Sequence, residues 1–118
     1  GSIKNHIIGE MWDKANVTAY RKVFGKDNVI TQVTIRIKGT DMEAVVDAVI
    51  KENGKVLFKE FKSGDAMLSP AQKKVYELMG QGKTDLLEPI GEKARQVWPD
   101  STKFKANTVE IVSETSIP

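Results

Sequence analysis

The sequence contains no cysteine and only one histidine, His6, among its 118 residues. Without cysteine the chain has no disulfide, no thiolate nucleophile and no cysteine-ligated zinc. A single histidine removes most routes to a catalytic triad or to a histidine-rich metal centre. No apolar run approaches the roughly 20 residues of a membrane-spanning helix. The location stays open, because a cysteine-free chain suits a reducing cytosol and also a secreted protein that unfolds in transit.

The composition indicates one folded domain covering residues 1–118. Hydrophobic residues make up 40% of the chain and charged residues 29%, which is typical of a soluble globular protein. This length is sufficient for a hydrophobic core. The net charge of +2 is a weak indication of an anionic partner, far short of a basic binding tail.

Hydrophobic periodicity predicts a helix, three strands, a second helix and a mixed tail. The expected elements are a helix over about residues 3–24, strands over 29–38, 43–51 and 56–62, a helix from residue 70, a short helix over 90–98 and a strand over 108–112. The pattern predicts an α/β (α+β) fold, with a central mixed, mainly antiparallel β-sheet flanked by helices.

The 43–51 strand is apolar on both sides and is therefore expected to lie in the centre of the sheet. Simple alternation divides its apolar side chains between two faces. One face is expected to carry Val45 and Val49, and the other Val46, Ala48 and Ile50.

The dipeptide Asn53-Gly54 lies between two apolar runs and is a strong signal for a tight hairpin. A two-residue turn fixes the register of its strands, and this register places Asp47 opposite Glu60. Lys62 lies two residues further along and shares the same face. Like charges that face each other across two strands repel, so this pair of carboxylates requires an explanation.

A divalent cation between Asp47 and Glu60 is the simplest explanation, because hard cations bind carboxylate oxygens. A metal beside Lys62 is a combination that phosphodiester hydrolysis uses. Two other interpretations stay open. In the first, Asp47 and Glu60 form plain surface ion pairs with Lys62; in the second, they are buried hydrogen-bond acceptors. The apolar flanks of both strands favour partial burial and therefore a functional role.

The helix after the hairpin has a clear N-terminal signature. Ser69 is suited to the N-cap, Pro70 to the first helical position, and Gln72 completes a capping box. The capping role of Gln72 needs no function, so the sequence leaves its place in a site open. The apolar stripe of this helix comprises Val75, Leu78 and Met79.

Asp47 followed by Glu60-Phe61-Lys62 resembles the core motif of the PD-(D/E)XK nuclease superfamily, the restriction-endonuclease-like fold. The stretch Leu68-Ser69-Pro70-Ala71-Gln72, with Tyr76 four residues later, is similar to the helix opening that follows this motif in many members. Gly9-Glu10 resembles the element of the first helix whose glutamate can complete the metal site. The similarity covers about residues 9–80, and one departure is the absence of proline before Asp47.

The resemblance implies a metal-dependent endonuclease. Its catalytic residues would be Asp47, Glu60, Lys62, Glu10 and Gln72, and its metal ligands Asp47, Glu60 and Glu10. The implied metal is Mg²⁺ or Mn²⁺, and zinc use occurs among relatives. The implied substrate is nucleic acid, with DNA slightly favoured over tRNA by analogy alone.

The tail resembles the end of nuclease domains found at the C-termini of polymorphic bacterial toxins, including contact-dependent growth inhibition effectors. The similarity lies in residues 89–94, Pro99 and the 108–112 strand. It implies a domain secreted or displayed within a larger protein, which acts in the cytoplasm of a target bacterium and is neutralised by an immunity protein. Two alternatives stay open: a DNA repair or junction-processing nuclease, and a catalytically inactive nucleic-acid-binding domain of the same fold.

Overall fold

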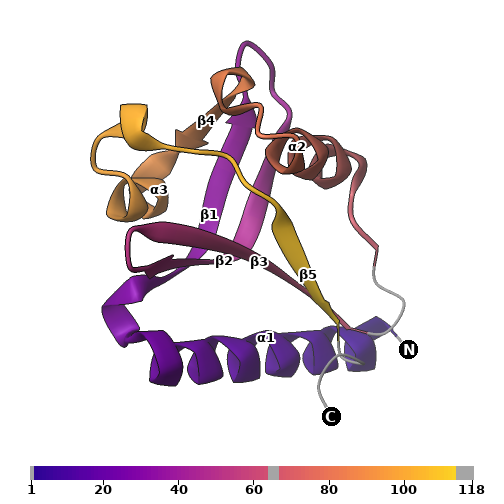
Figure 1. The fold of residues 1–118 in the computed structure, drawn as a ribbon. Coiled ribbons are helices and arrows are strands. Elements are labelled where there is room, and N and C mark those ends of the chain that lie inside the picture. The colour runs from indigo at the N-terminus through magenta and orange to yellow at the C-terminus, as the bar shows by residue number, and fades with distance from the viewer. Residues whose placement is uncertain (1, 64–66, 114–118) are drawn as a thin grey trace.

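In the part of the chain that the structure describes, five strands form one mixed sheet with helices on both of its faces (Figure 1). The computed structural model describes residues 2–63 and 67–113, with side chains from residue 13 onward. The sheet order is β4-β1-β2-β3-β5. The strands are β1 (Val29–Ile37), β2 (Glu43–Glu52), β3 (Lys55–Lys62), β4 (Leu87–Ile90) and β5 (Val109–Ser113). The helices are α1 (Ser2–Phe24), α2 (Pro70–Gly80) and α3 (Gly91–Val97).

The predicted fold class is confirmed, because the sheet of the described residues is mostly antiparallel, with one parallel pair, β3 with β5. The predicted helices and strands are all present, with ends that differ by a few residues. Strand β2 lies in the centre of the sheet, as its two apolar sides predict. The sequence pattern missed β4, a four-residue edge strand that contains Pro89. A proline is tolerated there because an edge strand leaves one side unpaired.

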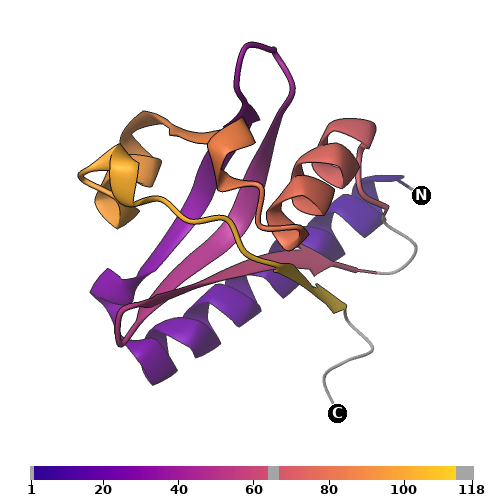
Figure 2. The same cartoon turned by 45° about the horizontal axis from the view of Figure 1, so that its top comes forward.

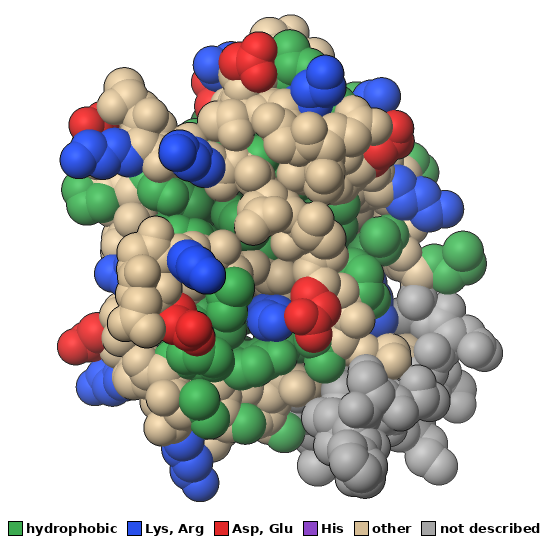
Figure 3. Space-filling model, in the orientation of Figure 1, with side chains coloured by type: hydrophobic (Ala, Val, Ile, Leu, Met, Phe, Trp, Pro, Cys, Tyr) green, Lys and Arg blue, Asp and Glu red, His purple; other side chains and the backbone are tan. Residues whose placement is uncertain are grey.

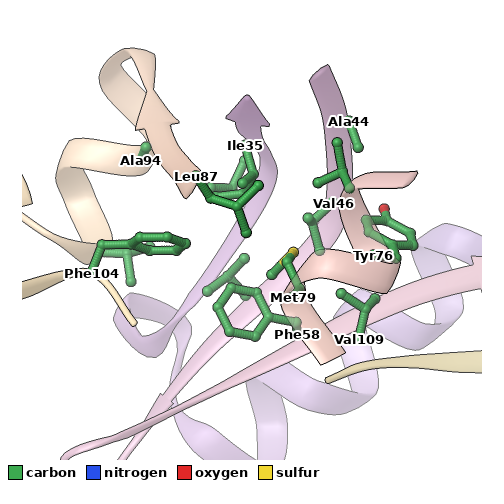
Figure 4. Packing of buried hydrophobic residues seen from close by; sticks show 14 of the residues in the cluster. Ile35, Ala44, Val46, Phe58, Tyr76, Met79, Leu87, Ala94, Phe104 and Val109 are labelled. Carbon is green, nitrogen blue, oxygen red and sulfur yellow. The ribbon is translucent and has the colours of Figure 1, made fainter. Parts of the chain in front are cut away.

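Two hydrophobic clusters lie on opposite faces of the sheet (Figures 1 and 2). The larger cluster packs between the sheet and the helices α2 and α3 (Figure 4). Within it Trp98 stacks on Phe58 and meets Phe104 edge to face, which makes Trp98 a core residue. The smaller cluster packs beneath α1, where the ring of Tyr20 stacks on Phe61 at 5.9 Å between centroids.

The expected division of the β2 side chains between the two faces is wrong. Val46 and Val49, three residues apart, both lie in the larger cluster, whereas Ala48 and Ile50 lie in the smaller one. The alternation therefore changes phase at Asp47. Simple alternation failed because it assumes an undistorted strand.

Strand β1 changes phase at the same level of the sheet. Ile30 and Val33 are also three residues apart and both face the larger cluster. Between them Gln32 has a positive φ of 57°, which is rare for a residue other than glycine. The pairing of the two strands stays in register across this point, from Thr31↔Ala48 to Val33↔Val46. Gln32 and Asp47 therefore lie opposite each other where both strands are distorted.

The predicted hairpin register between β2 and β3 is confirmed. Paired residues run from Glu52↔Lys55 at the turn to Ala48↔Lys59. Asn53 and Gly54 have φ values of 49° and 81°, as a tight hairpin turn of this type requires. The pairing ends at Ala48↔Lys59, one position before Asp47 and Glu60, so the register is confirmed up to these two acids but does not include them.

Met79 and Met67 provide a matched test of the core. Met79 is fully buried in the larger cluster, whereas Met67 is 76% exposed. Met79→Ala should lower the free energy of unfolding by about 2–5 kcal/mol, because it leaves a cavity that the packed interior cannot fill. Met67→Ala should change it by less than about 0.5 kcal/mol. Urea denaturation followed by circular dichroism measures both, and equal effects would contradict this description of the core.

Candidate active site

The carboxylate of Glu60 on β3 is the centre of the candidate site. This residue is 2% exposed and lies on the face of the sheet that α2 covers. Its Oε1 accepts a hydrogen bond from the Tyr76 hydroxyl at 2.8 Å. Its Oε2 accepts one from the Gln72 side-chain amide at 3.1 Å and lies 3.4 Å from the ammonium of Lys62. A buried carboxylate is therefore matched by three donors, as its desolvation requires.

The N-terminus of α2 positions two of these donors. The Ser69 hydroxyl accepts a hydrogen bond from the backbone amide of Gln72, and the side-chain oxygen of Gln72 accepts one from the backbone amide of Ser69. These two bonds confirm the predicted capping box. The side-chain NH₂ of Gln72 then remains available and donates to Glu60. Gln72 therefore both caps the helix and belongs to the candidate site, because its side-chain oxygen serves the cap and its side-chain nitrogen binds Glu60. Tyr76 lies one turn further along the same side of α2.

Asp47 lies beside Glu60 and is half-buried. Its Oδ2 accepts a hydrogen bond from the backbone amide of Phe61 at 2.8 Å, and its Oδ1 lies 3.5 Å from the side-chain amide of Gln32. Asp47 therefore binds the strand that carries Glu60 and Lys62. The predicted grouping of Asp47, Glu60, Lys62 and Gln72 is present in the structure.

Burial raises the pKa of Glu60 above its ordinary value, and the charge of Asp47 raises it further. The hydrogen bond from Tyr76 and the ammonium of Lys62 oppose this rise. Burial and the charge of Glu60 also raise the pKa of Tyr76, so its hydroxyl keeps its proton and remains a donor. The site thus combines two mutually repelling carboxylates with donors that stabilise the ionised form of Glu60.

Lys62 is the cation of the site. Its side chain is 19% exposed, compared with 3% for that of Glu60, so the ammonium lies between the buried acid and the surface. A lysine in this position can neutralise Glu60 and can also reach an anion that approaches from solvent. The alternative of a plain surface ion pair does not describe it, because its acidic partner is buried.

Glu10 lies on α1, and its side chain falls outside the described residues. Within the described part of the chain no group of three or more histidine, cysteine or acidic residues is placed to hold a metal ion. Asp47 and Glu60 supply two carboxylates, and their repulsion is a feature that a bound cation would relieve. Their oxygen donors suit Mg²⁺ or Mn²⁺.

Sequence reasoning missed one residue of the site, Gln32, and left the role of Tyr76 open. The spacing from Gln72 to Tyr76 predicted the same side of one helix, but it did not predict a contact with Glu60. Nothing in the sequence marked Gln32 as a site residue, because a left-handed backbone conformation is ordinarily predicted from a glycine or an asparagine.

Charges of both signs are interspersed over the described part of the face in Figure 3. Arg36, the basic residue of β1, is paired with Glu43 at 2.9 Å, so its charge is already matched by an acid. Among the described residues on this face, no broad basic surface marks a path for a polyanion.

No family model, curated protein or solved structure matches this chain. No helix in the described part of the chain is long and apolar enough to cross a membrane. The resemblance to PD-(D/E)XK nucleases therefore stays a prediction from the residues themselves.

The raised pKa of Glu60 makes the stability of the fold depend on pH. Below the ordinary value of 4.5, folded and unfolded chains both hold the Glu60 proton. Between 4.5 and the raised folded pKa only the folded chain holds it, so the free energy of unfolding falls as pH rises. Glu60→Gln removes this titration, so the stability of the variant relative to wild type should rise through that window and then level off.

Urea denaturation at a series of pH values from about 4 to about 8 measures the difference in the free energy of unfolding between Glu60→Gln and wild type. Glu77→Gln is the matched control, since Glu77 lies on α2 but is exposed. The control should follow the wild-type pH profile. A constant difference between Glu60→Gln and wild type at every pH would contradict the described environment of Glu60.

Proposed function

We propose that this protein is a metal-dependent nuclease that hydrolyses phosphodiester bonds of nucleic acid. The observation that carries the proposal is the buried Glu60 carboxylate, with Asp47 and Lys62 on the same patch of the sheet. A buried acid next to a half-buried one that repels it lowers the stability of the fold, and such arrangements are concentrated at functional sites. The motif resemblance supports the same reaction.

Asp47 and Glu60 would hold the metal ion, with Glu10 as the expected third ligand. When bound, Mg²⁺ or Mn²⁺ would supply a water of lowered pKa and would stabilise negative charge on the phosphate. Tyr76 and Gln72 fix the orientation of the Glu60 carboxylate through one hydrogen bond to each oxygen. Lys62 would donate a hydrogen bond to the phosphate oxygen that gains charge as water attacks phosphorus and the bond to the leaving oxygen breaks.

The proposed substrate is nucleic acid, with DNA favoured slightly over tRNA. This preference comes from the resemblance alone, in which Glu-x-Lys followed by glutamine is frequent among DNA-cutting members. The described residues offer no aromatic ladder for stacking single-stranded bases, since Trp98 and Phe104 are buried in the core.

Cleavage of supercoiled plasmid DNA and of total tRNA tests this proposal. Wild-type protein should cut one of these substrates with Mg²⁺ or Mn²⁺ and neither substrate with EDTA. Lys62→Met should lower the cleavage rate about 100-fold, because it removes the charge that stabilises the transition state but keeps the side-chain length. Asp47→Asn and Glu60→Gln should abolish detectable cleavage.

Lys55→Met is the matched control, since Lys55 is an exposed lysine at the hairpin turn of the same strand. It should cleave at the wild-type rate. Absence of cleavage of both substrates with every metal would favour the inactive nucleic-acid-binding domain. Cleavage that Asp47→Asn leaves undiminished would place the activity outside this site.

We further propose that the domain is an antibacterial toxin, delivered into a neighbouring bacterium as part of a larger protein and neutralised by a cognate immunity protein. The support is the similarity of the tail to toxin nuclease domains. In the structure this tail contributes β4 and α3 and the parallel edge strand β5. A DNA repair or junction-processing nuclease with the same site would lack toxicity and an immunity partner.

Induced expression of the domain in the bacterial cytoplasm separates these roles. The wild-type domain should stop growth, and Asp47→Asn, which should abolish cleavage, should not, because toxicity requires cleavage. Co-expression of the product of the neighbouring reading frame should restore growth. A wild-type domain that cleaves nucleic acid in vitro but leaves growth unaffected would refute the toxin role and would retain the nuclease.

A further inference from the structure

We infer that Gln32 is a positioning residue that holds the Asp47 carboxylate in its working orientation. The inference deepens the proposed nuclease function and rests on it for its catalytic consequence. Gln32 lies on β1 and is not one of the residues of the nuclease-like motif. Three observations carry the assignment: a strained backbone, a paired distortion of two strands and a side-chain contact.

The backbone of Gln32 lies in the left-handed region, with a φ of 57° in the middle of a nine-residue strand. This conformation costs a residue other than glycine about 1–2 kcal/mol. In the described part of the chain, Asn53 is the other non-glycine residue with a positive φ, and its hairpin turn requires that conformation. No turn accounts for Gln32, so its strain needs another reason.

The distortion at Gln32 occurs opposite Asp47. Both strands change the phase of their side chains at this level while their pairing stays in register. After Asp47, β2 pairs with β3 in the hairpin. Before Asp47, its residues Ala44 and Val46 pack in the larger cluster. Asp47 therefore lies at the junction, where its carboxylate reaches the Phe61 amide.

The side chain of Gln32 approaches the oxygen of Asp47 that does not bind Phe61. Its amide nitrogen lies 3.5 Å from Oδ1, and the Phe61 amide lies 2.8 Å from Oδ2. Two donors on opposite oxygens fix the plane of a carboxylate, whereas one donor leaves it free to rotate. Gln32 is a neutral donor, so it orients Asp47 without neutralising the negative charge that a cation would require.

Hydrogen exchange of the Phe61 backbone amide tests this role without reference to nuclease activity. Gln32→Met keeps the length of the side chain and removes the donor, and Gln32→Gly removes the donor and relieves the backbone strain. Both variants should increase the exchange rate of the Phe61 amide about 3- to 10-fold relative to that of Val49, because Asp47 rotates away more often. Both should also lower kcat on the cleaved nucleic acid by about 10-fold.

Asn53→Gly is the matched control, because it changes the other strained position far from Asp47 along the hairpin. It should leave both the Phe61 exchange ratio and kcat unchanged. An unchanged exchange ratio in Gln32→Met and Gln32→Gly would refute the positioning role, whatever the activity. Faster exchange in a protein whose wild type cleaves nothing would retain the positioning role and refute the nuclease instead.

Discussion

The burial of the Glu60 carboxylate governs the arrangement of the candidate site. An ionised acid at 2% exposure is tolerated only with donors on its oxygens and a cation nearby. Tyr76 and Gln72 supply the donors from α2, and Lys62 supplies the cation from β3 itself. The start of α2 therefore serves two purposes, since the residue that caps the helix also binds the acid beneath it.

Asp47 makes this arrangement less stable than it would otherwise be. Its charge acts against the ionised form of Glu60, and burial acts in the same direction. A fold selected for stability alone would place an amide or an apolar residue at one of the two positions. The repulsion within this pair is the observation that supports the proposed cation site, and with it the proposal of a nuclease over an inert domain of the same architecture.

Much of this site was predictable because it depends on short-range geometry. The Asn53-Gly54 turn determines the register of its own hairpin, so the approach of Asp47 to Glu60 followed from counting along two strands. The capping box at Ser69 and Gln72 is likewise local. The contact between Tyr76 and Glu60 was not predictable in this way, because it depends on how α2 packs on the sheet.

The sequence was sufficient to predict every helix and strand except β4, the central position of β2 and the grouping of Asp47, Glu60 and Lys62, since each follows from periodicity or from a two-residue turn. Periodicity and turn signals did not predict the phase change at Gln32 and Asp47 or the pairing of β4 at the edge of the sheet. Both depend on contacts between segments distant in sequence. Packing against two clusters on opposite faces can hold a strand in a conformation that its own residues disfavour.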